Sequence, residues 1–82
     1  MQVQPALTQV SGWMVQIASV SRPEDAEVLV NALRRRGYAV MVRRAVSDSL
    51  LHVQVGPYTN RSDANAMRKK LQNDGYNAVV EE

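Results

Sequence analysis

The chain has 82 residues and a mass of 9.1 kDa, which suits one small domain and excludes a two-domain enzyme. Apolar residues make up 45% of the sequence, so a packed core is expected, and the absence of cysteine excludes disulfides, thiolate metal sites and a cysteine nucleophile. Ten Lys and Arg against eight Asp and Glu give a net charge of +2, which is mild for a protein that binds nucleic acid.

The sequence contains no pattern typical of a catalytic or metal site. His52 is the single histidine, and no nucleophile set, carboxylate pair or phosphate loop has the required spacing. We therefore expect a non-catalytic domain without metal or cofactor. The longest apolar run, residues 38–42, is far shorter than the ~20 residues that span a bilayer, and no signal peptide pattern opens the chain. We expect no membrane insertion and interpret the chain as a C-terminal piece of a larger protein.

An internal repeat with an offset of 38 residues organises the chain. Shifted by this amount, residues 15–42 align with residues 53–80 without a gap. Eight of these 28 pairs are identical, whereas the composition alone gives about two. Two repeats are too few for a solenoid, so the halves are expected to pack against each other as one domain.

Each half predicts a strand, a helix and a second strand. In the first half, residues 13–19 alternate in polarity as a strand does, and residues 38–43 form the second strand. Between them, Ser21 and Glu24 have the spacing of a capping box, and Gly37 is suited to end the helix. The apolar face of this helix consists of Ala26, Leu29, Val30 and Leu33.

The second half repeats this order. Residues 50–55 predict a strand that the pair Gly56-Pro57 breaks, and residues 76–80 predict the last strand. The helix between them is expected to end at Gly75. Its candidate N-caps are Thr59, Asn60 and Ser62, and its inward face consists of Ala64, Met67 and Leu71. The polar residues 47–49 predict a turn that joins the two middle strands as a hairpin.

The order βαββαβ predicts an α+β fold, a ferredoxin-like (RNP-like) sandwich with a four-stranded antiparallel sheet and two helices on one face. Strand alternation sorts the side chains between the two faces of the sheet. Those expected to face the helices are Trp13, Val15, Ile17, Tyr38, Val40, Val42, Val53, Val55, Tyr76, Ala78 and Val80. The uncovered face, here called the bare face, is expected to expose Met14, Gln16, Ala18, Met41, Arg43, His52, Gln54, Asn77 and Val79.

Several short motifs resemble those of the sporulation-related repeat, or SPOR, domain family. Residues 15–20 (Val-Gln-Ile-Ala-Ser-Val) are similar to its opening strand motif, and residues 53–58 (Val-Gln-Val-Gly-Pro-Tyr) match its second signature. The family's helix positions and its helix-ending pairs are matched by Asp-Ala at 25–26 and 63–64 and by Gly-Tyr at 37–38 and 75–76. The chain departs from the pattern at Ala18, where glycine is common, and at Val20, where an aromatic residue is usual.

The resemblance implies a module of the bacterial cell envelope that binds peptidoglycan. Family members bind septal glycan strands that amidases have denuded of stem peptides, and they target a parent protein to the division site in the periplasm. The family's binding surface is the bare face, and its prominent glutamine and serine correspond to Gln16 and Ser19. We accordingly expect residues 1–12 to be a linker and residues 13–82 to be a monomeric SPOR domain, with repeats at about 13–43 and 51–81.

The bare face has chemistry that suits such a ligand. A denuded strand carries one lactyl carboxylate per disaccharide, and Gln16 and Gln54 can both donate to and accept from its hydroxyl and acetamido groups. Arg43 is a candidate partner for a carboxylate, as is His52 in its protonated form. Met14 and Met41 are expected to pack on sugar rings, and Asn77 completes the predicted glycan-binding set.

Two other functions share this fold. An RNA-binding domain of the RRM type requires stacking aromatics on the bare face, where the sequence places none. A ferredoxin-like protein-interaction or regulatory domain would form a concentration-dependent dimer with the sheet face buried between its subunits. We expect no nucleic acid partner.

Overall fold

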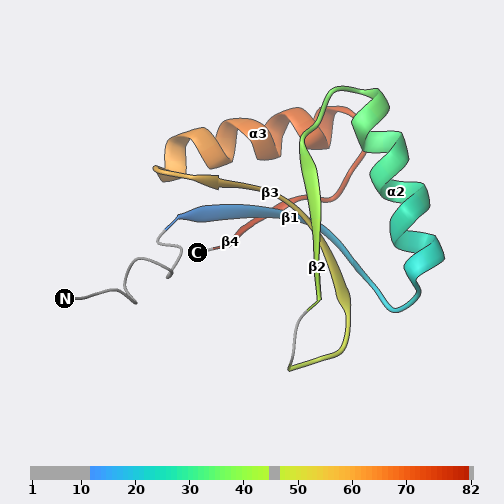
Figure 1. Ribbon diagram of the computed structural model, residues 1–82. Helices are drawn as coiled ribbons and strands as arrows, with labels where there is room; N and C mark the ends of the chain where they lie inside the picture. Colours follow the sequence, from blue (N-terminus) through green and yellow to red (C-terminus); the bar gives the residue numbers. More distant parts are fainter. Residues whose placement is uncertain (1–11, 45–46, 82) are drawn as a thin grey trace.

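The computed structural model describes residues 12–44 and 47–81. Its elements are β1 (Trp13–Val20), α2 (Pro23–Arg35), β2 (Val40–Arg44), β3 (Leu51–Tyr58), α3 (Arg61–Asn73) and β4 (Val79–Glu81). The strands form one antiparallel sheet in the order β2-β3-β1-β4 (Figure 1). The predicted α+β, ferredoxin-like sandwich is confirmed. Of the expected linker, only Gly12 belongs to the described residues.

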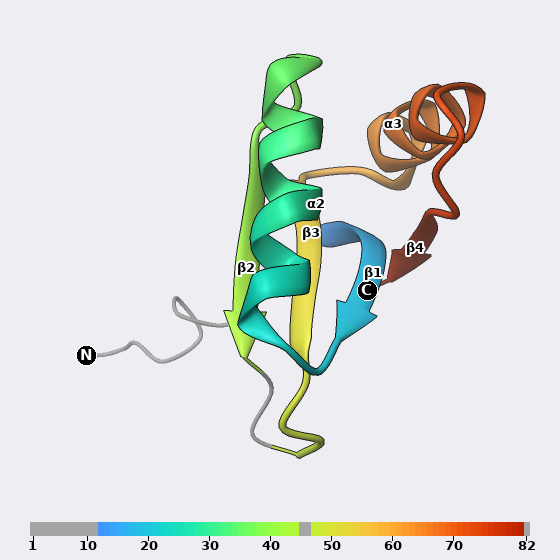
Figure 2. The same cartoon turned by 90° about the vertical axis from the view of Figure 1, so that its right-hand side faces the viewer.

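The two helices cover the same side of the sheet. Figure 2 shows α2 running beside β2, while α3 lies on the side of β1 and β4, in agreement with their contacts. This arrangement follows from the two βαβ crossovers, which return each helix over the same face of an antiparallel sheet. The other face has no helix over it and is the bare face. In the described part of the chain, neither helix has the length and apolar character needed to cross a membrane.

The two helices begin differently from one another. Pro23 is the first residue of α2 and Arg22 is its N-cap, with no side-chain hydrogen bond to the helix. The expected capping box of Ser21 and Glu24 is therefore wrong, because the helix begins one residue later than that motif requires. In α3 the predicted cap is present: Asn60 accepts a 2.8 Å hydrogen bond from the backbone N–H of Asp63.

Both helices end in the same backbone motif. Gly37 has a φ of +94°, which favours glycine, and the backbone N–H of Tyr38 donates to the carbonyl of Leu33 over 3.1 Å. Gly75 and Tyr76 repeat the motif after α3. Each glycine thus turns the chain so that the following tyrosine packs against the core.

The core lies between the helices and the sheet. Its buried apolar members are Val15, Ile17, Ala26, Val30, Leu33, Tyr38, Val40, Leu51, Val53, Val55, Ala64, Leu71 and Ala78. Almost all of these residues were expected in the core from the periodicity. Val42 was expected there as well, but it is 43% exposed, because the helices do not cover this part of the edge strand β2.

The strand limits also differ from those expected. β3 does not stop at Gly56-Pro57 but continues to Tyr58, which pairs with Trp13. β4 begins only at Val79, so Tyr76 and Asn77 precede the strand, and it includes Glu81. The predicted hairpin is present, since β2 and β3 are antiparallel neighbours.

Candidate functional site

A row of four side chains crosses the bare face through the middle of the sheet. Gln16 of β1 pairs with Gln54 of β3, which in turn pairs with Met41 of β2, and Gln16 pairs on its other side with Val79 of β4. Paired residues of neighbouring strands point to the same face. The row lies opposite the helices, because the adjacent strand residues Val15 and Val53 are in the core.

An irregularity in β1 brings a second row onto this face. The pairing of β1 with β3 shifts between Gln16 and Ala18, so that Ala18 pairs with Val53 and Ser19 pairs with His52. Strict alternation would put Ala18, and not Ser19, beside Gln16. The prediction that Ala18 lies on the bare face is therefore wrong, because a β-bulge reverses the order of the faces beyond it.

Gln16, Ser19 and His52 form one hydrogen-bonded group, here called the polar cluster. Gln16 Nε2 donates to Ser19 Oγ over 3.1 Å, and Gln16 Oε1 lies 2.9 Å from His52 Nδ1. Ser19 Oγ is itself 3.1 Å from the same ring nitrogen. These contacts join side chains that are 36 residues apart in sequence, and they fix the cluster at the centre of the bare face.

The other ring nitrogen of His52 contacts a carboxylate from the hairpin turn. His52 Nε2 lies 3.2 Å from Asp48 Oδ2 and 3.3 Å from Oδ1, and Asp48 Oδ1 also accepts a 3.0 Å bond from the backbone N–H of Leu50. The Leu50 N–H, and then His52, lower the pKa of Asp48, since both favour the ionised carboxylate. From the sequence, Asp48 was interpreted only as a turn residue. Its place in the turn, four positions before His52, was the available signal.

Gln54 lies on the bare face but is not accessible there. Its side chain is 1% exposed, although Gln16 beside it is only half-buried. Gln54 Nε2 donates to Gln16 Oε1 over 3.4 Å, and Gln54 Oε1 accepts from Arg43 Nε over 3.5 Å. The expectation of an exposed Gln54 is wrong, because its neighbours on β1 and β2 cover it. Gln54 is thus a buried hydrogen-bond donor to Gln16 of the polar cluster.

The other predicted residues lie at the margins of the cluster. Arg43, which pairs with His52, is exposed on the edge strand β2, and Met41 is 41% exposed beside Gln54. Met14 is half-buried at the far end of β1, and the exposed Asn77 precedes β4. The structure therefore gathers all of the predicted set except Asn77 along the β1, β2 and β3 part of the face.

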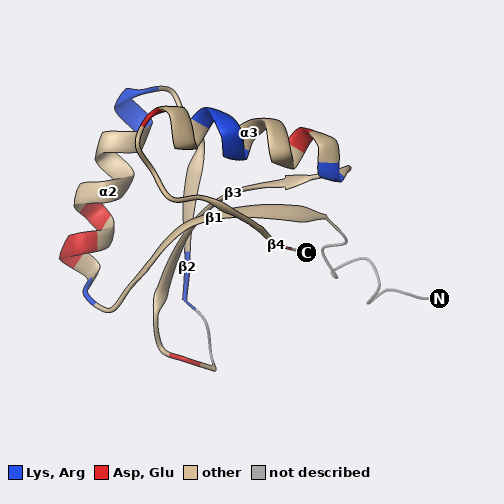
Figure 3. Cartoon of the chain, turned by 180° about the vertical axis from the view of Figure 1, so that it is seen from behind, with Lys and Arg blue, Asp and Glu red and all other residues tan. Residues whose placement is uncertain are grey.

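The charges around the cluster differ between the two edges of the sheet. Figure 3 shows that β1 and β3 contain no Lys, Arg, Asp or Glu, so these charged residues lie at the periphery of the sheet. Arg43 and Arg44 end β2, whereas Glu81 of β4 pairs with Met14 on the opposite edge. Glu81 was not among the predicted face residues, because the last strand was expected to end at Val80 and extends to Glu81. An anionic group is thus favoured near β2 and disfavoured near β4.

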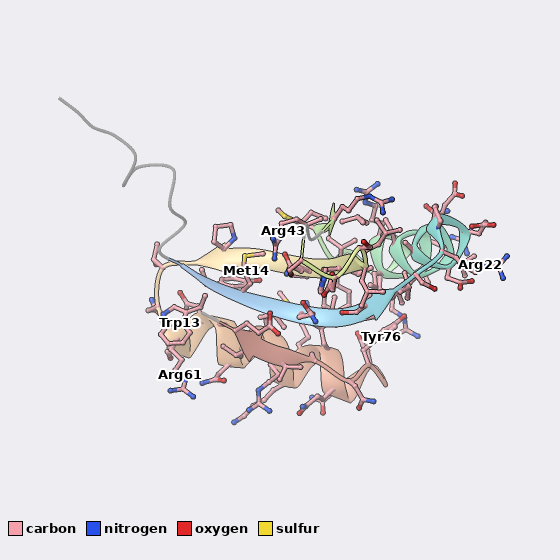
Figure 4. The ribbon with its side chains drawn as sticks, turned by 90° about the horizontal axis from the view of Figure 1, so that it is seen from below. Trp13, Met14, Arg22, Arg43, Arg61 and Tyr76 are labelled. Atoms are coloured by element: carbon pink, nitrogen blue, oxygen red, sulfur yellow. The ribbon has the colours of Figure 1, made fainter. Side chains whose placement is uncertain are left out.

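The aromatic side chains of the protein pack against the core. Tyr38 is 3% exposed, and Trp13, Tyr58 and Tyr76 contact the core while partly buried. Figure 4 shows Trp13 beside Arg61, whose guanidinium carbon lies 5.5 Å from the ring centroid, with Met14 on the other side of β1. The sequence has no other aromatic residue, so the bare face lacks the stacking platform of an RRM. Among the described residues no group of three metal-ligating side chains gathers.

The comparisons with known proteins agree with this architecture. A family model described as SPOR domain matches residues 9–80, so the chain belongs to the SPOR domain family. A solved structure, the solution structure of the peptidoglycan binding domain of the B. subtilis cell wall lytic enzyme CwlC, is similar with a TM-score of 0.72 and 27% sequence identity. The match covers 90% of this chain and 92% of that one. No match is found among curated proteins.

Proposed function

We propose that the protein is a non-catalytic module that binds the glycan strands of peptidoglycan through its bare face. The observation behind this proposal is the polar cluster of Gln16, Ser19 and His52, which stands on the uncovered side of a SPOR fold. The similar domain of CwlC is a peptidoglycan binding domain, which supports the same ligand class here. An open sheet face suits an extended polymer.

The preferred form of the ligand is the denuded strand. Removal of the stem peptide leaves a carboxylate on each lactyl group, and Arg43 at the β2 edge offers a guanidinium beside the cluster. Gln16 and Ser19 supply hydrogen bonds for oxygens of the ligand beside that guanidinium. Met14 and Met41 flank these groups with apolar surface for the sugar rings.

Co-sedimentation with purified sacculi, before and after amidase treatment, tests this function. Amidase treatment should increase the bound fraction of the wild type. Gln16→Glu places a negative charge in the cluster and should weaken binding by about 1–3 kcal/mol, or roughly 5- to 150-fold. The matched control is Asn31→Asp, which makes the same amide-to-carboxylate change on the exposed surface of α2. Equal binding by Gln16→Glu and Asn31→Asp would contradict the assignment of the bare face.

The purified domain also allows tests of the two other functions that share this fold. Retention of single-stranded RNA at moderate salt in a gel shift would favour an RRM-type function. We do not expect this result, because no aromatic side chain was placed on the bare face. A dimer that forms with increasing concentration and buries Gln16 would favour a protein-interaction domain. A monomer that sediments with amidase-treated sacculi is the result expected here.

We further propose that binding localises a parent envelope protein to the division septum, where denuded strands are produced. The test is a fluorescent fusion of this domain exported to the periplasm of dividing bacteria. The wild type and Asn31→Asp should collect at midcell, and Gln16→Glu should spread around the envelope. A Gln16→Glu fusion that collects at midcell as strongly as the wild type would contradict this role.

A further inference from the structure

The hydrogen bonds of the bare face form a chain whose two ends have fixed polarity. At one end, Arg43 can only donate, so the Gln54 atom that faces it must be the oxygen Oε1. Gln54 then turns its Nε2 toward Gln16, and Gln16 must present Oε1 to receive that bond. This 3.4 Å contact with a buried neighbour favours one orientation of the Gln16 carboxamide, and the shorter contact with His52 completes the positioning.

The opposite end of the chain imposes the same orientation. The Asp48 carboxylate is an acceptor, and His52 turns Nε2 toward it. His52 Nδ1 lies 2.9 Å from Gln16 Oε1, which is also an acceptor. Each ring nitrogen thus faces an acceptor oxygen, and Nδ1 donates to Gln16. The charged groups that face this ring are Asp48 from the hairpin turn and Arg43 from β2, while β1 contributes only the neutral Gln16 and Ser19.

Gln16 Oε1 therefore receives two donors and has no free lone pair for a ligand. Its Nε2 donates one hydrogen to Ser19 Oγ, and the second hydrogen remains. Ser19 Oγ accepts that bond with one lone pair, and its second lone pair faces the Nδ1–H of His52 at 3.1 Å, so its own hydrogen cannot point at that nitrogen. The hydroxyl hydrogen is consequently free as well. The polar cluster offers donors and no acceptor toward the bare face.

From this arrangement we infer that Asp48 and His52 are positioning residues that hold Gln16 and Ser19 as a donor pair, which selects a carboxylate of the ligand over a neutral hydroxyl or amide group. The inference rests on the proposed function for the identity of the ligand and on the contacts above for the role of the pair. A carboxylate supplies acceptors only and gains from the nearby guanidinium of Arg43. The positioning role also explains why Asp48, a turn residue outside the signature motifs, contacts His52 in the sheet.

The first part of the test uses the free protein, so it does not depend on any ligand. In nuclear magnetic resonance spectra of the wild type, the side-chain amide protons of Gln16 should show a cross-peak to Ser19. Asp48→Leu removes the acceptor for His52 and should abolish that cross-peak, whereas Asp48→Asn keeps an acceptor oxygen and should restore it. Glu27→Leu, which makes the same loss of charge on the exposed side of α2, should leave it unchanged. A cross-peak that survives in Asp48→Leu overturns the inference.

The second part measures affinity for two defined probes. These are a denuded tetrasaccharide from amidase-treated glycan and its derivative with the lactyl carboxylates converted to methylamides. The wild type should prefer the carboxylate form by about tenfold, the effect of one hydrogen bond to a charged group. Asp48→Leu should reduce this preference to about twofold, while Asp48→Asn and Glu27→Leu retain it. Equal preference in Asp48→Leu and the wild type overturns the inference. If the wild type binds neither probe and the cross-peaks behave as expected, the positioning is supported and the proposed function fails.

Discussion

The two repeats place their matching glutamines side by side, but the two side chains differ in their exposure and in the residues that they contact. Gln16 and Gln54 are equivalent in the repeat and pair directly across β1 and β3. Gln54 is 1% exposed and contacts Arg43 of β2, whereas Gln16 is half-buried beside the three-residue strand β4. A duplicated motif therefore supplies one residue for contact and one for support, and Gln54 is the supporting one because Arg43 and Gln16 both contact its side chain.

The segments that follow these glutamines differ as well. In the first repeat, a bulge after Gln16 turns Ser19 onto the bare face. In the second repeat, the strand pairing also shifts opposite the equivalent residues, Gly56 and Pro57, and the glycine approaches Met14 closely with a φ of +132°. The first repeat thus gains a polar group, and the second gains a close contact between strands.

The largest expected effect tests whether the repeats are equal in the core. Leu33 and Leu71 are repeat mates, one on each helix, and both are 0% exposed. Truncation to alanine should cost about 2–5 kcal/mol in either case, because each leaves a cavity between helix and sheet. Urea denaturation of Leu33→Ala and Leu71→Ala gives these values. A loss below about 1 kcal/mol at both positions would contradict the assignment of the helix faces.

Gly56→Ala tests the close contact that only the second repeat makes. A Cβ at this position would lie 3.1 Å from the carbonyl oxygen of Trp13 and 3.1 Å from Sδ of Met14, at a φ that side chains rarely adopt. We expect a loss of about 1–3 kcal/mol. Gly37→Ala is the control, since it has a positive φ of +94° with no atom within 4 Å of the added carbon. Denaturation curves that show an equal loss for both variants would mean that the contact with β1 is not responsible.

The sequence was sufficient for the architecture because the repeat and the apolar periodicity are local signals. The face assignment of Gln16 followed from strand alternation and agrees with the pairing. Alternation failed at Ala18 because a bulge depends on the partner strand, which a single strand does not reveal. The placement of Ser19 came instead from the family resemblance.

Burial on the bare face was also beyond the reach of the sequence. Gln54 was expected to be exposed because no helix covers it, yet Arg43 and Gln16 reach over it. Long polar side chains can cover a neighbour in a way that depends on the order of the strands. Asp48 was missed for a related reason, since only the folded hairpin turns it toward His52.

Alanine substitutions at Gln16 and Gln54 test whether Gln54 stabilises the fold while Gln16 contacts the ligand. Gln54→Ala removes a buried amide that bonds two neighbours, so we expect a loss of about 1–2 kcal/mol in the free energy of unfolding. Gln16→Ala removes the acceptor of Gln54 Nε2, but its half-buried position admits water to that group, so it should cost less, at most about 1 kcal/mol, while weakening co-sedimentation with sacculi. Thermal and urea denaturation measure the first effect. If Gln16→Ala is the more destabilising variant, the division of roles between the repeats is wrong.

The smallest expected effect concerns the tyrosines that follow the two helices. The hydroxyl of buried Tyr38 donates to the carboxylate of Asp74, which also lies 3.4 Å from Arg36, and these contacts join the ends of α2 and α3. Its repeat mate Tyr76 is partly exposed. Tyr38→Phe should therefore cost about 1 kcal/mol, and Tyr76→Phe should be nearly neutral when both are compared by urea denaturation.

The same asymmetry predicts a different response to alkaline pH. Burial, reinforced by the bond to Asp74, raises the pKa of Tyr38 from 10.0 to about 12, because the phenolate is disfavoured in the folded state. The unfolded chain loses this proton first, so the stabilising contribution is complete below about pH 10 and is lost as the pH rises through about 12. Between about pH 10 and 11.5, the free energy of unfolding should fall more steeply in the wild type than in Tyr38→Phe, and Tyr76→Phe should follow the wild type. If the free energy of unfolding of the wild type and of Tyr38→Phe falls in parallel with pH, the contacts between the ends of α2 and α3 do not depend on the neutral hydroxyl of Tyr38. The two tyrosines would then be more alike than their burial indicates.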